Sequence, residues 1–159
     1  AIAGAIRLRD ELAPACKIAV LSNGTRADVP AVHDALMKVD DNILKLDTVD
    51  PSYIQLLDQP VGPYDVEHQI ETFASFDGHV IIQTMFLTGS FGERSLDNTG
   101  DEYVGPWLEA LERIRPQMAT IYTVARDTPA PGLEKAPKEA LDAIAGRVRA
   151  LGVPCQVSY

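Results

Sequence analysis

Lys45 and Asp47 bring an amine and a carboxylate close together in the segment NILKLDTVD, residues 42–50, which otherwise reads as a strand. Successive side chains of a strand point to opposite faces, so Leu44 and Leu46 share one face while Lys45 and Asp47 share the other. A buried amine and carboxylate are costly unless they are paired and hydrogen-bonded. The pattern therefore predicts either a solvated face with a local ion pair or a lined site inside a larger structure.

Other polar residues occupy similar places on neighbouring strand-like segments. In α/β folds the reactive groups lie at the carboxyl ends of parallel strands, where the loops converge. Ser22 and Asn23 end the first such segment, although Ser-Asn-Gly also fits a plain turn. Arg126 lies just beyond the fourth segment, and Gln83 would lie near the charged pair if the strands neighbour in chain order. A layer of Lys, Asp and Gln side chains suits a polyhydroxyl group such as a ribose.

The sequence contains no self-contained catalytic set. It has no Ser-His-Asp arrangement, no zinc-ligand spacing and no glycine-rich phosphate loop. Cys16 and Cys155 belong to no CxxC pair, so we expect two reduced thiols and no metal site.

The elements that must position these side chains alternate between helix and strand. Apolar residues at helical spacing predict helices at residues 2–13, 30–39, 51–57, 66–76, 101–114 and 138–151. Short apolar runs predict strands at residues 16–22, 42–47, 79–87, 118–124 and 155–159, with long loops at 88–100 and 125–137. Strands that alternate with helices of this length form right-handed βαβ units on a parallel sheet.

One face of each predicted strand is polar or large. A sheet covered by helices on both faces should instead read as near-continuous Val, Ile and Leu. We therefore expect an α/β fold, a partial, TIM-like (β/α) barrel whose parallel sheet carries helices on its convex side only. The residues expected on the concave face are Ser22, Lys45, Asp47, Gln83, Met85, Thr120 and Tyr122.

Size and charge exclude several classes of function. The 159 residues, 46% of them hydrophobic, suffice for one globular domain, residues 1–159. They fall short of the roughly 250 residues of a complete eight-unit barrel. A net charge of −9 without any basic stretch argues against a nucleic-acid partner. No apolar run reaches membrane-spanning length and no secretory leader opens the chain, so we expect a cytoplasmic protein.

Taken in chain order, the motifs at these strand ends resemble the radical S-adenosylmethionine (radical SAM) superfamily, in particular stand-alone bacterial iron–sulfur oxidoreductases. The matching segments are VLSNGT, NILKLDTVD, DQPVGPYDVE, IIQTMFLTG, LDNT and IYTVARDTPAPGLEKAP. The family's partial barrel has a CxxxCxxC loop after its first strand, which holds a [4Fe-4S] cluster, and a Gly-Gly-Glu-like motif after its second. This chain has neither motif. The resemblance therefore implies the C-terminal part of such a barrel.

The resemblance also implies a wall that binds S-adenosylmethionine. In the whole enzyme the cluster would cleave this small-molecule cofactor reductively and start radical chemistry on a substrate that the resemblance does not name. This chain alone should hold no cluster and be inactive. The implied cofactor-binding residues are Ser22 and Asn23 on the third barrel strand, Lys45 and Asp47 on the fourth, Gln83 on the fifth, Tyr122 on the sixth, and Arg126, which would meet the substrate or a carboxylate.

Two other classes of function fit the same residues. One is a barrel-type aldolase or isomerase with Lys45 as a Schiff-base or proton-transfer residue, which requires a lysine of lowered pKa. The other is a non-catalytic α/β binding module. A CxxxCxxC motif encoded upstream of Ala1 would favour the radical SAM enzyme, and a start codon at Ala1 would count against it. If the chain is the truncated barrel, the sheet edges exposed by truncation would allow self-association.

Overall fold

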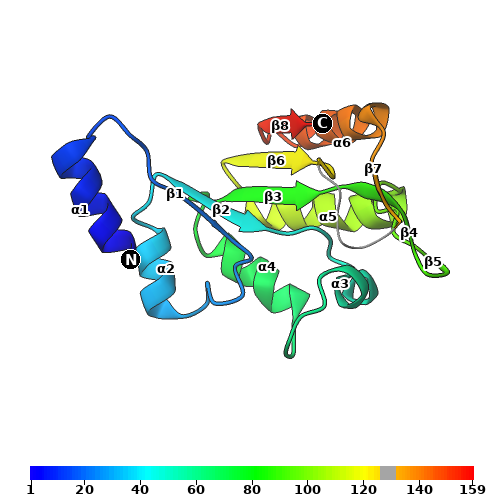
Figure 1. Ribbon diagram of the computed structural model, residues 1–159, viewed down its shortest axis with the longest axis horizontal. Helices are drawn as coiled ribbons and strands as arrows, with labels where there is room; N and C mark the ends of the chain where they lie inside the picture. Colours follow the sequence, from blue (N-terminus) through cyan, green and yellow to red (C-terminus); the bar gives the residue numbers. More distant parts are fainter. Residues whose placement is uncertain (126–131) are drawn as a thin grey trace.

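The computed structural model describes residues 1–125 and 132–159, and a parallel β-sheet is its central feature (Figure 1). The strands of this sheet follow one another in chain order, β1-β2-β3-β6-β8, without a reversal. The sheet is open, with β1 and β8 at its edges. The predicted sequential parallel sheet is therefore confirmed. Its strands are β1 (Ala19–Ser22), β2 (Asp41–Lys45), β3 (Ile81–Met85), β6 (Met118–Tyr122) and β8 (Cys155–Ser158).

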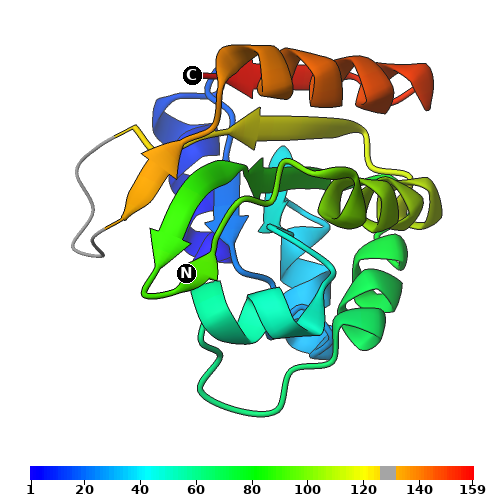
Figure 2. The ribbon, with the colours of Figure 1, turned by 90° about the vertical axis from the view of Figure 1, so that its right-hand side faces the viewer.

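Helices cover one face of the sheet. In Figures 1 and 2, α4, α5 and α6 lie side by side along it. The core lies between these helices and the strand residues that face them, such as Leu44, Ile82 and Ile121, each at most 1% exposed. The predicted one-sided arrangement is thus confirmed. The helices are α1 (Ile2–Leu12), α2 (Pro30–Leu36), α3 (Pro51–Leu57), α4 (Val66–Ala74), α5 (Asp101–Ile114) and α6 (Lys138–Ala150).

Local sequence signals fix the ends of the helices nearest the polar residues. The Asp50 side chain caps α3 by accepting a hydrogen bond of 2.7 Å from the Tyr53 amide, and Pro51 occupies the first turn, where its missing N–H costs nothing. The Asp65 side chain caps α4 in the same way. Each helix therefore begins where its sequence predicts.

A small antiparallel sheet, β5-β4-β7, was not predicted. It consists of β4 (Leu87–Phe91), β5 (Arg94–Ser95) and β7 (Leu133–Lys135), in segments that the sequence indicates as loops or as the end of the third strand. Gly89 makes the pairing possible, because a Cβ atom there would lie 2.0 Å from the Gly132 carbonyl oxygen. The paired segments β4 (LTGSF) and β7 (LEK) are short and lie more than 40 residues apart, so no local hydrophobic pattern predicts their pairing.

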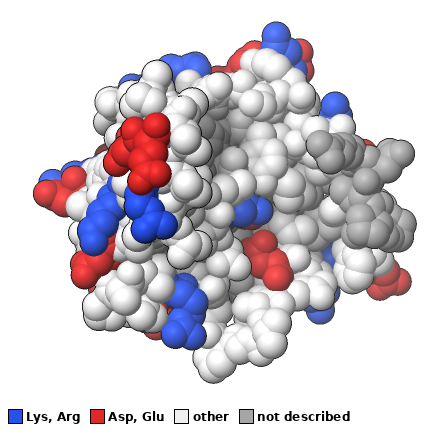
Figure 3. Space-filling view, turned by 60° about the vertical axis from the view of Figure 1, so that its left-hand side comes forward, with Lys and Arg blue, Asp and Glu red and all other residues white. Residues whose placement is uncertain are grey.

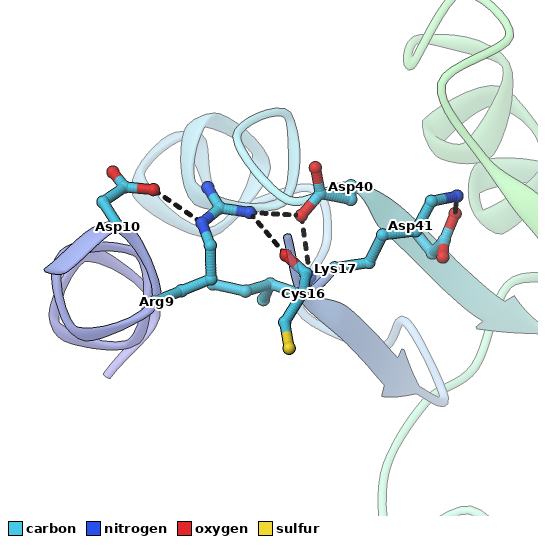
Figure 4. A network of polar contacts seen from close by, with 7 residues as sticks. Arg9, Asp10, Cys16, Lys17, Asp40 and Asp41 are labelled. Atoms are coloured by element: carbon cyan, nitrogen blue, oxygen red, sulfur yellow. Dashed lines mark hydrogen bonds and ion pairs between the residues drawn. The ribbon is translucent and has the colours of Figure 1, made fainter. Parts of the chain in front are cut away.

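Polar contacts, rather than buried side chains, attach α1 to the sheet. None of its residues is buried. The Arg9 guanidinium lies 2.9 Å from the Asp40 carboxylate and also donates to the Cys16 carbonyl oxygen (Figure 4). Asp40 in turn accepts a hydrogen bond of 2.7 Å from the Ile18 amide, which is the main reason why its pKa lies below the ordinary value. This network joins α1 to the amino ends of β1 and β2.

Candidate functional site

A row of polar side chains crosses the sheet on the face opposite the core. Lys45 on β2 is in register with Gln83 on β3, Gln83 with Thr120 on β6, and Thr120 with Gln156 on β8. Residues in register on parallel strands point to the same face, so the four side chains form one layer. The expectation that Gln83 lies beside the charged pair is confirmed. Sequence reasoning missed Gln156, since only the register places it here.

Ser22 lies on the other face, which corrects the expectation that it joins this row. It is in register with Leu44, whose side chain is fully buried in the core. Leu21, which does share the face of the polar row, is 60% exposed. The Ser22 hydroxyl accepts a hydrogen bond of 3.1 Å from the Gly24 amide. The Ser22 side chain is therefore part of a turn, which is the alternative that the Ser-Asn-Gly sequence also allowed.

Asn23 lies at the carboxyl end of β1 and is positioned by the same turn. Its side-chain oxygen accepts hydrogen bonds from both the amide and the hydroxyl of Thr25. Gly24 has a positive φ of 72°, and a Cβ atom there would lie 2.6 Å from the buried ring of Phe73. The Gln69 side chain also donates 3.0 Å to the Gly24 carbonyl oxygen. Helix α4 thus fixes the place of this turn.

Lys45 and Asp47 form an ion pair, with the Lys45 Nζ atom 2.9 Å from Asp47 Oδ2. The Asp47 side chain is 4% exposed, and the Lys45 side chain is 32% exposed. Asp47 Oδ1 accepts a further hydrogen bond of 2.8 Å from the Met85 amide. The carboxylate therefore links the ends of β2 and β3 as well as neutralising the lysine.

The surroundings of Lys45 keep its ammonium charged. Burial acts to lower its pKa, but the attraction of Asp47, with a smaller contribution from Tyr122, outweighs this and raises the pKa above its ordinary value. A Schiff-base lysine needs the opposite shift, because only the neutral amine is nucleophilic. The aldolase alternative therefore lacks its required feature.

Lys45 is expected to form no trapped adduct when the protein is treated with a keto or aldehyde substrate, such as pyruvate, and borohydride. Its raised pKa leaves the amine protonated at neutral pH. The ion pair therefore stabilises the fold fully below about pH 10.5, the ordinary lysine pKa, and this contribution is lost as the pH rises further. Peptide mass mapping would detect the adduct. Selective modification of Lys45, absent from the surface-exposed Lys17, would restore the aldolase alternative.

A pocket of about 190 Å³ opens beside the charged pair. One side is the end of β2, and the other is the segment between α3 and α4, which contributes Asp58 and Tyr64. Asp58 and Tyr64 were not predicted, because Pro60, Gly62 and Pro63 signal a turn but not the direction in which it folds. The residues around the pocket are Asn23, Thr25, Lys45, Leu46, Asp47, Thr48, Ile54, Asp58, Pro60 and Tyr64.

Figure 3 shows one hollowed face of the molecule, where a basic and an acidic group lie close together among uncharged atoms. Elsewhere on this face Lys and Arg side chains alternate with Asp and Glu and do not merge into a basic patch. A hollow of this kind suits a small ligand that is recognised by a few polar groups.

Buried polar groups hold the base of the site. The Trp107 indole nitrogen donates to the Leu46 carbonyl oxygen at 3.2 Å and to the Thr84 hydroxyl oxygen at 3.1 Å. Asn98, fully buried, donates to the Met85 carbonyl oxygen and accepts a hydrogen bond from the Leu87 amide. These contacts fix the backbone on both sides of Asp47. No periodic pattern marks Asn98, because it lies in a polar loop.

The residues present fit a nucleoside-type ligand but not an iron–sulfur cluster. The row offers amine, amide and hydroxyl groups, and the Thr120 hydroxyl oxygen is buried without a hydrogen-bond partner within the described residues. Cluster ligands are usually cysteine thiolates. Cys16 and Cys155 form no disulfide. Cys16 lies shortly before β1 and Cys155 begins β8, and these two strands are the opposite edges of the sheet.

Further findings concern metal sites, membranes and Arg126. Across residues 1–125 and 132–159, no group of three or more His, Cys, Asp or Glu side chains is placed to hold a metal ion. Nor does this part of the chain contain a helix with the length and apolar character needed to cross a membrane.

Arg126, predicted to meet the substrate or a carboxylate, lies outside the described residues.

Several solved structures share this architecture. A radical SAM methyltransferase from Sphaerobacter thermophilus superposes with a TM-score of 0.66 over 89% of this chain and 40% of its own, at 16% identity. A domain of pyruvate-formate lyase-activating enzyme from Bacteroides vulgatus superposes with a TM-score of 0.67 over 99% of this chain and 93% of its own, at 14% identity. SuiB from Streptococcus suis superposes with a TM-score of 0.60 over 89% of this chain and 32% of its own, at 12% identity.

The chain shares the fold of these three solved structures. The resemblance inferred from the strand-end motifs is therefore confirmed at the level of architecture. The chain spans about 40% of the methyltransferase and about a third of SuiB, but nearly all of the solved activating-enzyme domain. No protein-family model matches the chain, and no curated protein matches it.

Proposed function

We propose that residues 1–159 form a single domain that supplies the cofactor- and substrate-binding wall of a radical SAM oxidoreductase in the cytoplasm. The observation that carries this proposal is the polar row of Lys45, Gln83, Thr120 and Gln156 on the open face of the sheet. Apolar residues would be expected on this face if it were only part of a packed core. The match to a solved domain of nearly the same extent supports the single-domain assignment.

Each group in the wall has a distinct part in binding. Lys45 and Gln83 would donate hydrogen bonds to ribose oxygens, and Asp47 would accept one from a ribose hydroxyl while holding Lys45 in place. Tyr122, on the same face as Thr120, would flank the adenine. Asn23 would contact the cofactor from the end of β1, and Ser22 would act through the turn that positions Asn23. S-adenosylmethionine, cleaved reductively in the whole enzyme, supplies the radical that acts on the substrate.

Nucleoside binding tests the proposal directly. The 159-residue chain is titrated calorimetrically with S-adenosylmethionine and with 5′-methylthioadenosine, a neutral nucleoside that keeps the adenine and ribose. NMR chemical-shift changes at Lys45, Gln83 and Thr120 on addition of either nucleoside would support the proposal that these residues form the binding wall. Binding of neither compound would overturn the proposal.

Anaerobic reconstitution with iron and sulfide is expected to leave this chain colourless and free of iron. Two cysteines at opposite edges of the sheet cannot ligate one cluster. Iron and sulfide analysis, with an absorption spectrum, makes the measurement. A longer form that carries a CxxxCxxC loop should gain the brown colour. Stoichiometric iron and sulfide in the 159-residue chain would contradict the placement of the cluster outside it.

A further inference from the structure

Asp58 lies where two hollows of the surface meet. It lines the pocket of about 190 Å³ beside Lys45 and Asp47. It also lines a larger hollow of about 770 Å³ between the turn after β1 and the segment that joins α3 to α4. Asn23, Thr25, Pro60 and Tyr64 line both hollows as well. A ligand that extends from the smaller pocket into the larger one would therefore pass these five shared residues, of which Asp58 is the only charged one.

The charges around the smaller pocket do not balance. Asp47 is neutralised by Lys45 at 2.9 Å. Within residues 1–125 and 132–159, the Asp58 side chain forms no hydrogen bond or ion pair, and the residue is exposed to solvent. Its surroundings hold a second carboxylate and a single amine, so the pocket carries an excess negative charge when Asp58 is ionised. An excess of this sign favours a cation.

The larger hollow has the same sign of imbalance. It is lined by Asp28, Asp58 and Asp65, opposed by Arg26. His68 lies 3.5 Å from Asp28 at its side and so is already partnered. Both hollows therefore present more carboxylates than fixed cations to whatever occupies them.

We propose that Asp58 is a further ligand-binding residue of the site, whose carboxylate receives the positively charged end of the ligand. The inference rests on the proposed function, under which the positive charge at that end is the sulfonium of S-adenosylmethionine. Lys45, Gln83 and Thr120 would then hold the nucleoside, and Asp58 would distinguish the charged cofactor from neutral nucleosides. Tyr64 completes this end of the pocket as a neutral hydroxyl, since burial, and then the nearby carboxylates, raise its pKa to about 12.

The environment of Asp58 makes such binding depend on pH. Desolvation, followed by repulsion from Asp47, raises the pKa of Asp58 to about 6, against a smaller lowering effect of Lys45. The carboxyl group is therefore mostly ionised at pH 7 and mostly neutral at pH 5. With the neutral carboxyl group binding the cation about tenfold more weakly than the carboxylate does, we expect about a fivefold weaker affinity for S-adenosylmethionine at pH 5 than at pH 7.

The experiment compares two nucleosides on two variants. The 159-residue chain and Asp58→Asn are titrated with S-adenosylmethionine and with 5′-methylthioadenosine at pH 5 and pH 7. Asp58→Asn should weaken the binding of S-adenosylmethionine at pH 7 by about tenfold and abolish its pH dependence. The affinity for 5′-methylthioadenosine should stay unchanged. Asp34→Asn, on the exposed surface of α2, makes the same change in net charge away from both hollows and serves as the matched control.

The possible outcomes separate the two proposals. If 5′-methylthioadenosine binds but Asp58→Asn leaves both the affinity for S-adenosylmethionine and its pH dependence intact, the role of Asp58 is overturned and the nucleoside wall stands. A pH dependence that persists in that variant would likewise overturn the role of Asp58. If neither compound binds the unaltered chain, the wall fails, and the role of Asp58 fails with it. A melting curve confirms that Asp58→Asn is folded.

Discussion

Trp107→Ala is expected to lower the free energy of unfolding by about 3–5 kcal/mol, the usual cost of truncating a buried Trp. Trp107 is 1% exposed, and its ring packs edge-on against Phe86 with centroids 5.3 Å apart. Its indole N–H also donates to the Leu46 carbonyl oxygen, directly before Asp47. The substitution therefore removes both core packing and a support of the site. A denaturant melt measures the loss.

Trp107→Phe separates these two contributions. Phenylalanine keeps most of the aromatic packing but has no N–H, so we expect a loss of about 1–2 kcal/mol. The Leu46 carbonyl oxygen would keep one hydrogen bond, from the Thr84 hydroxyl at 2.8 Å. A loss of stability below 1 kcal/mol for Trp107→Ala would contradict the first prediction, because it would show that Trp107 does not anchor α5 to the sheet.

The parts of the site that were predictable from the sequence depend on strand alternation. Leu44 and Leu46 are buried while Lys45 points to the other face, as a period of two residues requires. The place of Gln83 followed from assuming that neighbouring strands are sequential, which holds in most α/β sheets. Local periodicity and one general rule of topology were enough for these residues.

The failure at Ser22 has a different cause. Its predicted face came from its place at a strand end, not from alternation. At the edge strand β1 the apolar side chain of Leu21 faces the open side and is 60% exposed, so hydrophobicity does not report which face is buried. Only the register with Leu44 decides the matter. Edge strands with so little burial leave their orientation weakly specified by sequence.

Contacts between distant segments account for the remaining misses. Asn98 joins Met85 and Leu87 to the end of β2, and Asp58 reaches the pocket only because the segment between α3 and α4 folds back over β2. Gln156 enters the polar row through its register with Thr120. Such placements depend on tertiary packing, which a single sequence shows only where a periodic pattern accompanies it.

Asp47→Ala is expected to lower the free energy of unfolding by about 2–4 kcal/mol. It leaves the Met85 amide without its acceptor and Lys45 without its counter-charge. The cost falls below that of a fully buried pair because the Lys45 side chain, 32% exposed, retains some contact with water. Asp47→Asn keeps an acceptor for the Met85 amide and should recover part of the loss. Denaturant melts of both variants make the comparison.

Nucleoside affinity then decides whether Asp47 is more than a structural link between β2 and β3. If its carboxylate also accepts a hydrogen bond from a ribose, folded Asp47→Ala should bind 5′-methylthioadenosine more weakly by roughly 1–3 kcal/mol, the cost of an unmatched buried polar group. Lys45→Met, which removes the other member of the pair, should weaken binding by a similar amount, because it deletes a donor to the same ribose. We expect both losses in calorimetric titrations below the melting temperature of each variant. Reduced stability with unchanged affinity would remove Asp47 from the ligand-binding wall, and Lys45 with it, and would leave the ion pair a purely structural feature of this sheet.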